Sequence, residues 1–200
     1  MAEAIGPAVL NRSASVRGCG TVLSAAFARE PGLRWICGDA TVRRERWFAA
    51  TLAAHDTLPG ARRLTLDRGG VPIAAIVLTP PGGTPPARAK ARWVTGTGLG
   101  CGPGALVRTL RYAHGAETAT PQGAWTLEFL GVVPEHRGLG AARRLLDHVV
   151  SELPAPGGIF LTTADPENER LYRRFGFTTR QHLVLGPLTT AAMWRPGATA

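Results

Sequence analysis

Hydrophobic residues follow two different periods in the region that begins at Trp125. The first is a short apolar run with two aromatic residues, Trp125 and Phe129, which is typical of a β-strand. Pro134 ends this run, because proline has no N–H to donate to a strand ladder. Apolar residues then recur at steps of three or four and predict a helix whose apolar stripe contains Leu139, Ala142, Leu146, Val149 and Leu153. The pattern therefore predicts a strand, a turn and a helix in direct succession.

Apolar patterns predict further strands and helices on both sides of this region. The predicted strands are residues 7–12, 61–67, 71–79, 159–163, 177–185 and 191–195. The predicted helices are residues 13–28, 41–55 with Asp39 or Thr41 as the cap, 105–116, and one that begins at Asp165 and stops at Gly176. Strands and helices alternate, which favours a mixed α/β fold of one domain over residues 1–200.

Two stretches lack a regular pattern. Residues 80–89 are rich in proline and glycine and predict a loop. Residues 93–104 carry a glycine at every second position from Gly96 to Gly102, but they lack the third glycine of a GxGxxG motif and no strand precedes them. A flexible connection is therefore favoured over a phosphate site, and residues 80–123 form the variable segment.

The turn between Pro134 and the following helix has the features of an anion site. Its sequence is Arg137-Gly138-Leu139-Gly140-Ala141-Ala142. The first N–H groups of a helix have no partner within it, and the helix dipole adds partial positive charge there. Glycines let a phosphate approach the backbone, and Arg137 and Arg143 can supply full charges. The alternative is that Gly138 and Gly140 only permit a tight turn.

This stretch resembles the signature of the GNAT superfamily of acyl-CoA-dependent N-acyltransferases. The family pattern is Arg or Gln, two residues, Gly, one residue, then Gly or Ala, and Arg137, Gly140 and Ala142 match it. The resemblance implies a mostly antiparallel sheet, splayed at the acyl-CoA site and flanked by helices. It also implies that the amides of residues 138–142 hold the coenzyme A pyrophosphate, and that the backbone of Val132 and Val133 binds the pantetheine arm.

A second block is similar to another GNAT element. Asn168 and Tyr172 are followed by Phe175-Gly176-Phe177. The resemblance implies that this helix lies beside the pantetheine arm, with Asn168 against the arm and Tyr172 giving a proton to the departing thiolate. The spacing from Asn168 to Tyr172 is shorter than in many members. The alternative for Tyr172 is a core aromatic residue.

A looser likeness extends to the puromycin N-acetyltransferase branch. It covers Ala26-Phe27, the helix at residues 43–46, the strand end at residues 76–80 and the block at residues 167–177. The resemblance implies acetyl-CoA, or another acyl-CoA, as co-substrate and a small-molecule amine as acceptor. The expected parts of the domain are a coenzyme-binding core at about residues 124–186 and acceptor-side helices at about residues 13–56.

Transfer to an amine needs a base, an oxyanion donor and an acid. Glu128 is the candidate base, because strand alternation places it on one face with Thr126, Leu130 and Val132. The alternative is a solvated or ion-paired strand residue. The backbone N–H of Val132 is the candidate oxyanion donor and Tyr172 is the candidate acid.

Charge and composition limit the kinds of molecule that the protein is expected to bind. The formal net charge is +9, and Lys90 is the only lysine. Such a surface suits coenzyme A, or an acidic acyl carrier protein whose phosphopantetheine thioester would be an alternative donor. No nucleic-acid motif, membrane span or signal peptide is evident, so a cytoplasmic protein, monomer or homodimer, is expected.

The cysteines and histidines do not suggest further chemistry. Cys19, Cys37 and Cys101 are widely spaced, so neither a disulfide framework nor a metal site is indicated. Nothing near Cys101 would lower its pKa, which favours direct transfer over a covalent route. His55 and His114 have no assigned role, and surface positions are expected for both.

Overall fold

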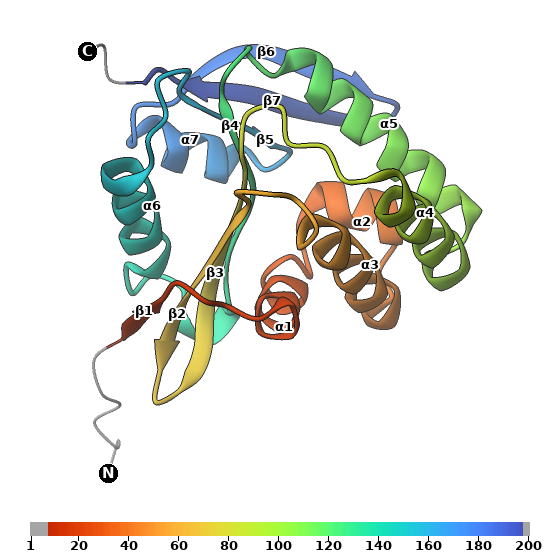
Figure 1. Ribbon diagram of the computed structural model, residues 1–200, viewed down its shortest axis with the longest axis horizontal. Helices are drawn as coiled ribbons and strands as arrows, with labels where there is room; N and C mark the ends of the chain where they lie inside the picture. The colour runs from red at the N-terminus through yellow and green to blue at the C-terminus, as the bar shows by residue number, and fades with distance from the viewer. Residues whose placement is uncertain (1–7, 198–200) are drawn as a thin grey trace.

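A mixed sheet lies at the centre of the computed structural model, which describes residues 8–197 (Figure 1). Its strands are β1 (Val9–Asn11), β2 (Arg62–Arg68), β3 (Val71–Thr79), β4 (Trp125–Val132), β5 (Ile159–Thr163), β6 (Thr178–Leu185) and β7 (Leu188–Arg195). They lie in the order β1-β2-β3-β4-β5-β7-β6. Every neighbouring pair is antiparallel except β4 and β5, which are parallel. The predicted mixed α/β fold with a mostly antiparallel sheet is confirmed.

The sheet opens between its two halves, at the parallel pair. β4 and β5 pair only at Trp125 with Ile159 and at Thr126 with Phe160, near the start of both strands. β4 continues to Val132 beside β3, and β5 continues to Thr163 beside β7. The two strands therefore separate after their first residues, which is the splay expected from the resemblance.

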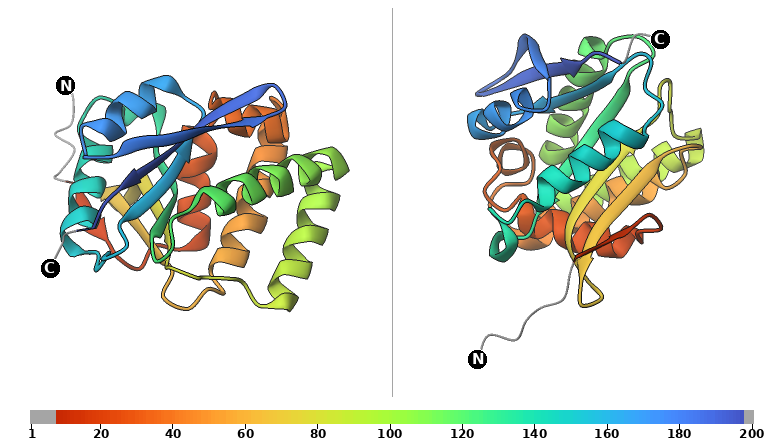
Figure 2. Two further views of the ribbon diagram at one scale, coloured as in Figure 1. Left: turned by 90° about the horizontal axis from the view of Figure 1, so that it is seen from above. Right: turned by 90° about the vertical axis from the view of Figure 1, so that its left-hand side faces the viewer.

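Helices cover both faces of the sheet. They are α1 (Val16–Ala26), α2 (Pro31–Cys37), α3 (Thr41–His55), α4 (Ala87–Cys101), α5 (Pro103–Ala119), α6 (Ala141–Glu152) and α7 (Pro166–Arg173), with a short 3-10 helix, η1 (Pro134–His136). α6 packs against β2, β3 and β4, and α7 packs against β5 on the same side (Figure 1). α1 packs against β3 and β4 on the opposite side, where α3 lies between α1 and α4 (Figure 2). Among the described helices, none is long and apolar enough to span a bilayer.

A β-bulge in β4 changes which side chains share a face. Val77 of β3 pairs with Phe129 of β4. The next β3 residue, Leu78, pairs with Leu127, so Glu128 is the extra residue of a bulge. Leu127 packs in the core under α6, whereas Phe129 packs in the core under α1 and α3. Alternation along β4 is therefore reversed at Glu128.

The bulge corrects one prediction. Strict alternation placed Glu128 on the face of Leu130 and Val132, but these two residues pack against the α6-side core. Glu128 instead lies with Phe129 on the side of α1 and α3, because the inserted residue shifts the period of two by one position.

Several predicted elements differ from the structure in extent. Residues 31–37 form a helix that was not predicted, with Pro31 in its first turn. Residues 93–101 belong to α4 and are not a flexible connection, because their glycines lie close to neighbouring helices. Ala40 caps α3, so neither Asp39 nor Thr41 does. The predicted first strand is shorter, at Val9–Asn11, and Pro7 lies outside the described residues.

The predicted stripe of α6 also needs correction. Leu146 and Val149 are buried as predicted. Leu139 lies in the turn and is 64% exposed, whereas Ala141 and Leu145 are buried in its place. The helix begins at Ala141, so residues before it do not follow the helical period.

Candidate functional site

The turn before α6 has backbone N–H groups without a protein acceptor. Gly138 and Gly140 have φ of 76° and 79°, a backbone region that favours glycine, and Gly140 caps the helix. Within residues 8–197, no protein group accepts a hydrogen bond from the N–H groups of residues 138–142. A Cβ atom built on either glycine would meet no protein atom within 4 Å. This open set of donors at a helix N-terminus can receive the oxygens of an anion such as a diphosphate.

Arg137 lies at this turn but contacts the protein backbone. Its Nη2 donates to the carbonyl oxygen of Ala26 at 2.6 Å, and its Nε lies 3.5 Å from that of Val132. The side chain is exposed. Arg137 therefore joins the end of α1 to the end of β4 and leaves its positive charge beside the turn.

The end of β4 directs one N–H toward the gap in the sheet. The Val133 N–H donates to the carbonyl oxygen of Ile73 at 2.9 Å, on the β3 side. Backbone N–H groups alternate in direction along a strand, so the Val132 N–H is directed away from β3. β4 has no pairing with β5 at this position, so the group has no strand partner. It can donate to a ligand placed between the two strands.

Glu128 extends from the bulge into the space under α1 and α3. Its Oε1 accepts a hydrogen bond from the Thr79 hydroxyl at 2.7 Å. The side chain lines a cavity and keeps accessible surface, while the protein atoms packed around the carboxyl raise its pKa by desolvation, partly offset by the Thr79 bond. A carboxylate of raised pKa in a cavity can accept a proton from a bound group.

Tyr172 and Asn168 come from α7, on the other side of the gap. Asp165 caps α7 by accepting from the Glu167 N–H, and Pro166 occupies its first turn. The ring of Tyr172 packs edge-on against Phe177 at a centroid distance of 5.7 Å. Burial raises the pKa of the Tyr172 hydroxyl, and the charge of Glu30 raises it further. The hydroxyl therefore stays protonated at neutral pH.

One cavity of about 190 Å³ brings the candidates from both halves together. It lies where β4 and β5 separate and is lined by Glu128, Asn168 and Tyr172. The turn at residues 138–142, Val132 and Arg137 are not among its lining residues. The predicted residues thus form two groups, a turn with unpartnered N–H groups beyond the end of β4 and a cavity with a carboxyl and a phenol beside the gap.

Aromatic side chains form much of the cavity wall. Phe27, Trp47 and Phe129 all line it and pack edge-on with one another or with Phe48, at centroid distances between 5.2 and 6.0 Å. The other aromatic residues of the wall are Trp93, Tyr112, Phe160 and Tyr172. The edge-on packing of four aromatic rings makes this side of the cavity rigid.

Sequence reasoning missed several lining residues. Trp93 and Tyr112 lie on α4 and α5, in the segment predicted to be variable. Glu30 also lines the cavity; it caps α2 by accepting from the Leu33 N–H at 2.6 Å. The sequence Glu30-Pro31 held a signal, because proline is favoured in the first turn of a helix.

The histidines and Cys101 lie outside the cavity. His114 is exposed as predicted, but His55 is only 6% exposed, so its predicted surface position is wrong. The buried ring contacts the Leu78 carbonyl oxygen through Nε2 at 3.2 Å, and burial lowers the pKa of His55 to about 4. The Cys101 thiol donates to the Arg43 carbonyl oxygen, and burial raises its pKa, which does not favour a nucleophilic thiolate.

Comparisons with known proteins agree with this geometry. The sequence model of the Acetyltransferase (GNAT) family matches residues 32–177. A comparison with curated proteins finds no match. A Corynebacterium glutamicum structure described as histone acetyltransferase HPA2 and related acetyltransferase is similar, with 18% identity, a TM-score of 0.71, and coverage of 98% of this chain and 99% of that one.

Two further solved structures share the fold. The ribosomal-protein-S18-alanine N-acetyltransferase of Escherichia coli has 14% identity and a TM-score of 0.58, over 97% of this chain and 96% of that one. The polyamine N-acetyltransferase of Drosophila melanogaster has 14% identity and a TM-score of 0.55, over 94% and 98%. At these identities the similarity shows the fold alone.

Proposed function

The chain belongs to the acetyltransferase (GNAT) family, and from this premise we propose that it transfers an acetyl group from acetyl-CoA to the amine of a small molecule. Membership makes it an acetyltransferase that uses an acyl-CoA as co-substrate. The observation that supports the proposal is the gap between β4 and β5, which has a cavity with Glu128 and Tyr172 beside it and the free N–H groups of residues 138–142 beyond the end of β4.

The fit of coenzyme A depends on the turn. The N–H groups of residues 138–142 have no protein acceptor, and both glycines face open space. The pyrophosphate accepts hydrogen bonds from these N–H groups, which belong to Gly138, Leu139, Gly140, Ala141 and Ala142. The positive charge of Arg137 adds to the electrostatic attraction at the helix N-terminus. The backbone of Val132 and Val133, together with Asn168, lies along the pantetheine arm.

Three groups would carry the chemistry. Glu128 accepts the proton of the amine, directly or through water, so that the nitrogen lone pair can attack the thioester carbon. The new C–N bond leaves negative charge on the carbonyl oxygen, which the Val132 N–H stabilises. The C–S bond then breaks, and the Tyr172 hydroxyl donates its proton to the departing thiolate.

The parts of the domain divide this work. Residues 124–186 form the coenzyme-binding core, and the helices between residues 13 and 56 supply walls on the acceptor side. Residues 80–123 add Trp93 and Tyr112 to these walls. The likeness to the puromycin branch adds an aminonucleoside-like amine to the panel, as the larger acceptor to be compared with single-ring amines.

The test is an assay of free thiol release with acetyl-CoA and a panel of primary amines, together with calorimetry of coenzyme A binding. We expect thiol release that depends on both substrates, and coenzyme A binding without an amine. No turnover with any amine and no binding of coenzyme A would refute the proposal. Poor use of acetyl-CoA, with salt-sensitive binding of an acidic acyl carrier protein, would point to the carrier thioester as donor.

A further inference from the structure

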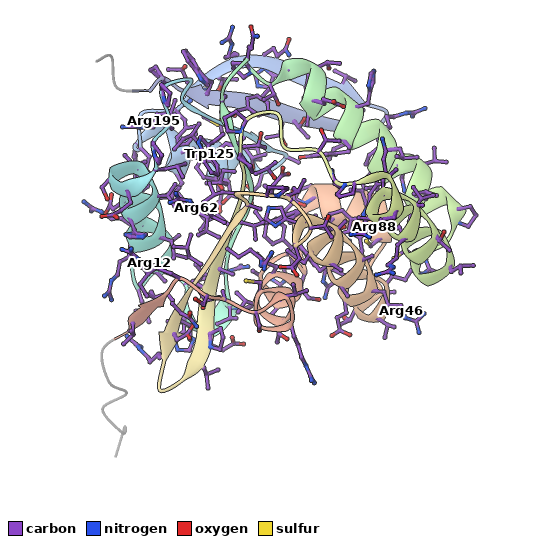
Figure 3. The ribbon with its side chains drawn as sticks, in the orientation of Figure 1. Arg12, Arg46, Arg62, Arg88, Trp125 and Arg195 are labelled. Carbon is purple, nitrogen blue, oxygen red and sulfur yellow. The ribbon has the colours of Figure 1, made fainter. Side chains whose placement is uncertain are left out.

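The cavity differs from the rest of the protein in the sign of its charges. Among the described residues that line it, the charged ones are two glutamates, Glu30 and Glu128, and none is arginine, lysine or histidine. The chain as a whole carries 23 Lys and Arg against 14 Asp and Glu. Exposed arginines lie on the outside instead, for example Arg46 and Arg88 on α3 and α4 (Figure 3). A cavity that is negative inside a positive protein selects for a cationic ligand.

The two carboxyl groups line the same cavity. Burial raises the pKa of the Tyr112 hydroxyl, and the charges of Glu30 and Glu128 raise it further; burial and the Glu30 charge likewise raise the pKa of Tyr172. Oε2 of Glu30 accepts from the Leu33 N–H, and Oε1 of Glu128 accepts from Thr79. The Glu30 carboxyl also bonds the Gly32 N–H, whereas Glu128 has one oxygen outside these bonds. Glu128 is the proposed base, whereas Glu30 is a second acidic group that the proposed reaction does not use.

The polar atoms of three wall residues, Trp47, Trp93 and Tyr112, already have partners. Trp47 Nε1 donates to the Thr109 hydroxyl at 2.9 Å, and Trp93 Nε1 donates to the Thr51 hydroxyl at 3.2 Å. The Tyr112 hydroxyl bonds the Thr162 hydroxyl at 2.9 Å. These three residues therefore offer a ligand mainly the faces and edges of their rings.

The size of the cavity limits the size of the ligand. It measures about 190 Å³, and a closed apolar cavity of ~150 Å³ holds one benzene molecule. In the proposed reaction the thioester end of the acyl donor lies beside Asn168 and Tyr172 and takes up part of this space, so the remainder suits at most one aromatic ring with a short arm. A carboxylate on that arm would lie beside Glu30 and Glu128 without a cationic side chain to pair with, which is unfavourable.

We infer that the acceptor is a single-ring aromatic amine without a carboxylate, and that Glu30 is the residue that selects it. That the ligand is an acceptor rests on the proposed acetyl transfer, whereas the preference for this ligand is a property of binding alone. Glu30 attracts the ammonium form of the amine into the cavity, and it repels amino acids that carry the same ring. Its role is specificity, because Glu128 takes the proton.

The test measures binding of paired probes to the full-length protein, by calorimetry and by the fluorescence of Trp47 and Trp93. The pairs are phenethylamine with phenylalanine, and tyramine with tyrosine; hexylamine tests the need for a ring. We expect each amine to bind at least ~30-fold more tightly than its amino acid, and phenethylamine to bind at least ~10-fold more tightly than hexylamine.

Variants test Glu30 itself. Glu30→Gln keeps an oxygen that can cap α2, so we expect it to fold, to bind phenethylamine ~10-fold more weakly and to reduce the discrimination against phenylalanine. Glu45→Gln, on the exposed side of α3, removes the same charge outside the cavity. It should leave the affinity for phenethylamine and the discrimination against phenylalanine unchanged. A purely structural role of Glu30 would change stability but not the ratio between the paired probes.

The outcomes separate this inference from the proposed function. Equal or tighter binding of the amino acids, equal binding of hexylamine, or the same ratio in Glu30→Gln as in Glu45→Gln would overturn it. Discrimination in binding without any acetyl-CoA turnover would support the ligand preference and refute the acetyl transfer. Turnover with phenylalanine at least as fast as with phenethylamine would support the transfer and overturn the preference.

Discussion

Protonation of His55 should weaken the fold as the pH falls, because the ring is held neutral. The Leu78 carbonyl oxygen can only accept a hydrogen bond, so Nε2 of His55 carries the hydrogen. Nδ1 then faces Arg63 Nη1 at 3.5 Å as an acceptor. A second proton would place two positive groups against each other in a site that is only 6% exposed. Burial is the largest cause that lowers the pKa to about 4.

The pKa shift sets the direction and size of the effect. The folded-state pKa lies below that of the unfolded chain, so the unfolded state binds more protons between about pH 4 and 6.5. The contribution of His55 to the free energy of unfolding is therefore complete above about pH 6.5 and disappears toward pH 4. The full difference is about 3 kcal/mol, and about 2 kcal/mol of it is lost by about pH 5.

Urea unfolding at about pH 7.5 and about pH 5 measures this term when wild type is compared with His55→Gln. The glutamine amide can donate to the Leu78 carbonyl oxygen but does not titrate, so the variant should lose about 2 kcal/mol less than wild type between the two values. His114→Gln, at an exposed position, is the matched control and should behave as wild type. The same loss in wild type and in His55→Gln would show that the ring is not held neutral.

The other predictions concern the site and its support. Tyr172→Phe keeps the packing on the α6 side and should lower kcat at least ~10-fold with coenzyme A binding intact; an unchanged kcat would remove Tyr172 from acid catalysis. Glu128→Gln should lower kcat ~100-fold and abolish the fall in rate as the pH drops through the raised pKa of this carboxyl, and a retained acidic limb would contradict its role. Gly140→Ala forces a side chain into positive φ, so KM for acetyl-CoA should rise and stability fall by about 1 kcal/mol, measured by kinetics and urea unfolding. Gly131→Ala would place a Cβ 2.7 Å from that of Ala26 and should lower the free energy of unfolding by about 1–3 kcal/mol. The double variant with Ala26→Gly should recover part of this loss, and an unchanged stability of the single variant would contradict the close packing.

The sequence determined the parts whose physical cause is local. Proline at 134 and glycines at 138 and 140 end β4, form the turn and start α6, because backbone restrictions act over a few residues. Local apolar patterns and turn residues likewise predicted the positions of β2, β3 and α7. Periodicity failed at Leu139, which precedes the helix, and at Glu128, where one inserted residue reversed the faces of β4.

Only the tertiary structure decided where the pieces meet. The glycines at 96, 98 and 100 predicted a flexible segment, but α4 is helical there because its neighbours α3 and α5 pack closely against it. Glu30 and Tyr112 are far from Glu128 in sequence, and they share a cavity with it because the sheet opens between β4 and β5. A short sequence encodes strands and turns through local sterics, whereas a cavity depends on packing between distant segments, which no local pattern records.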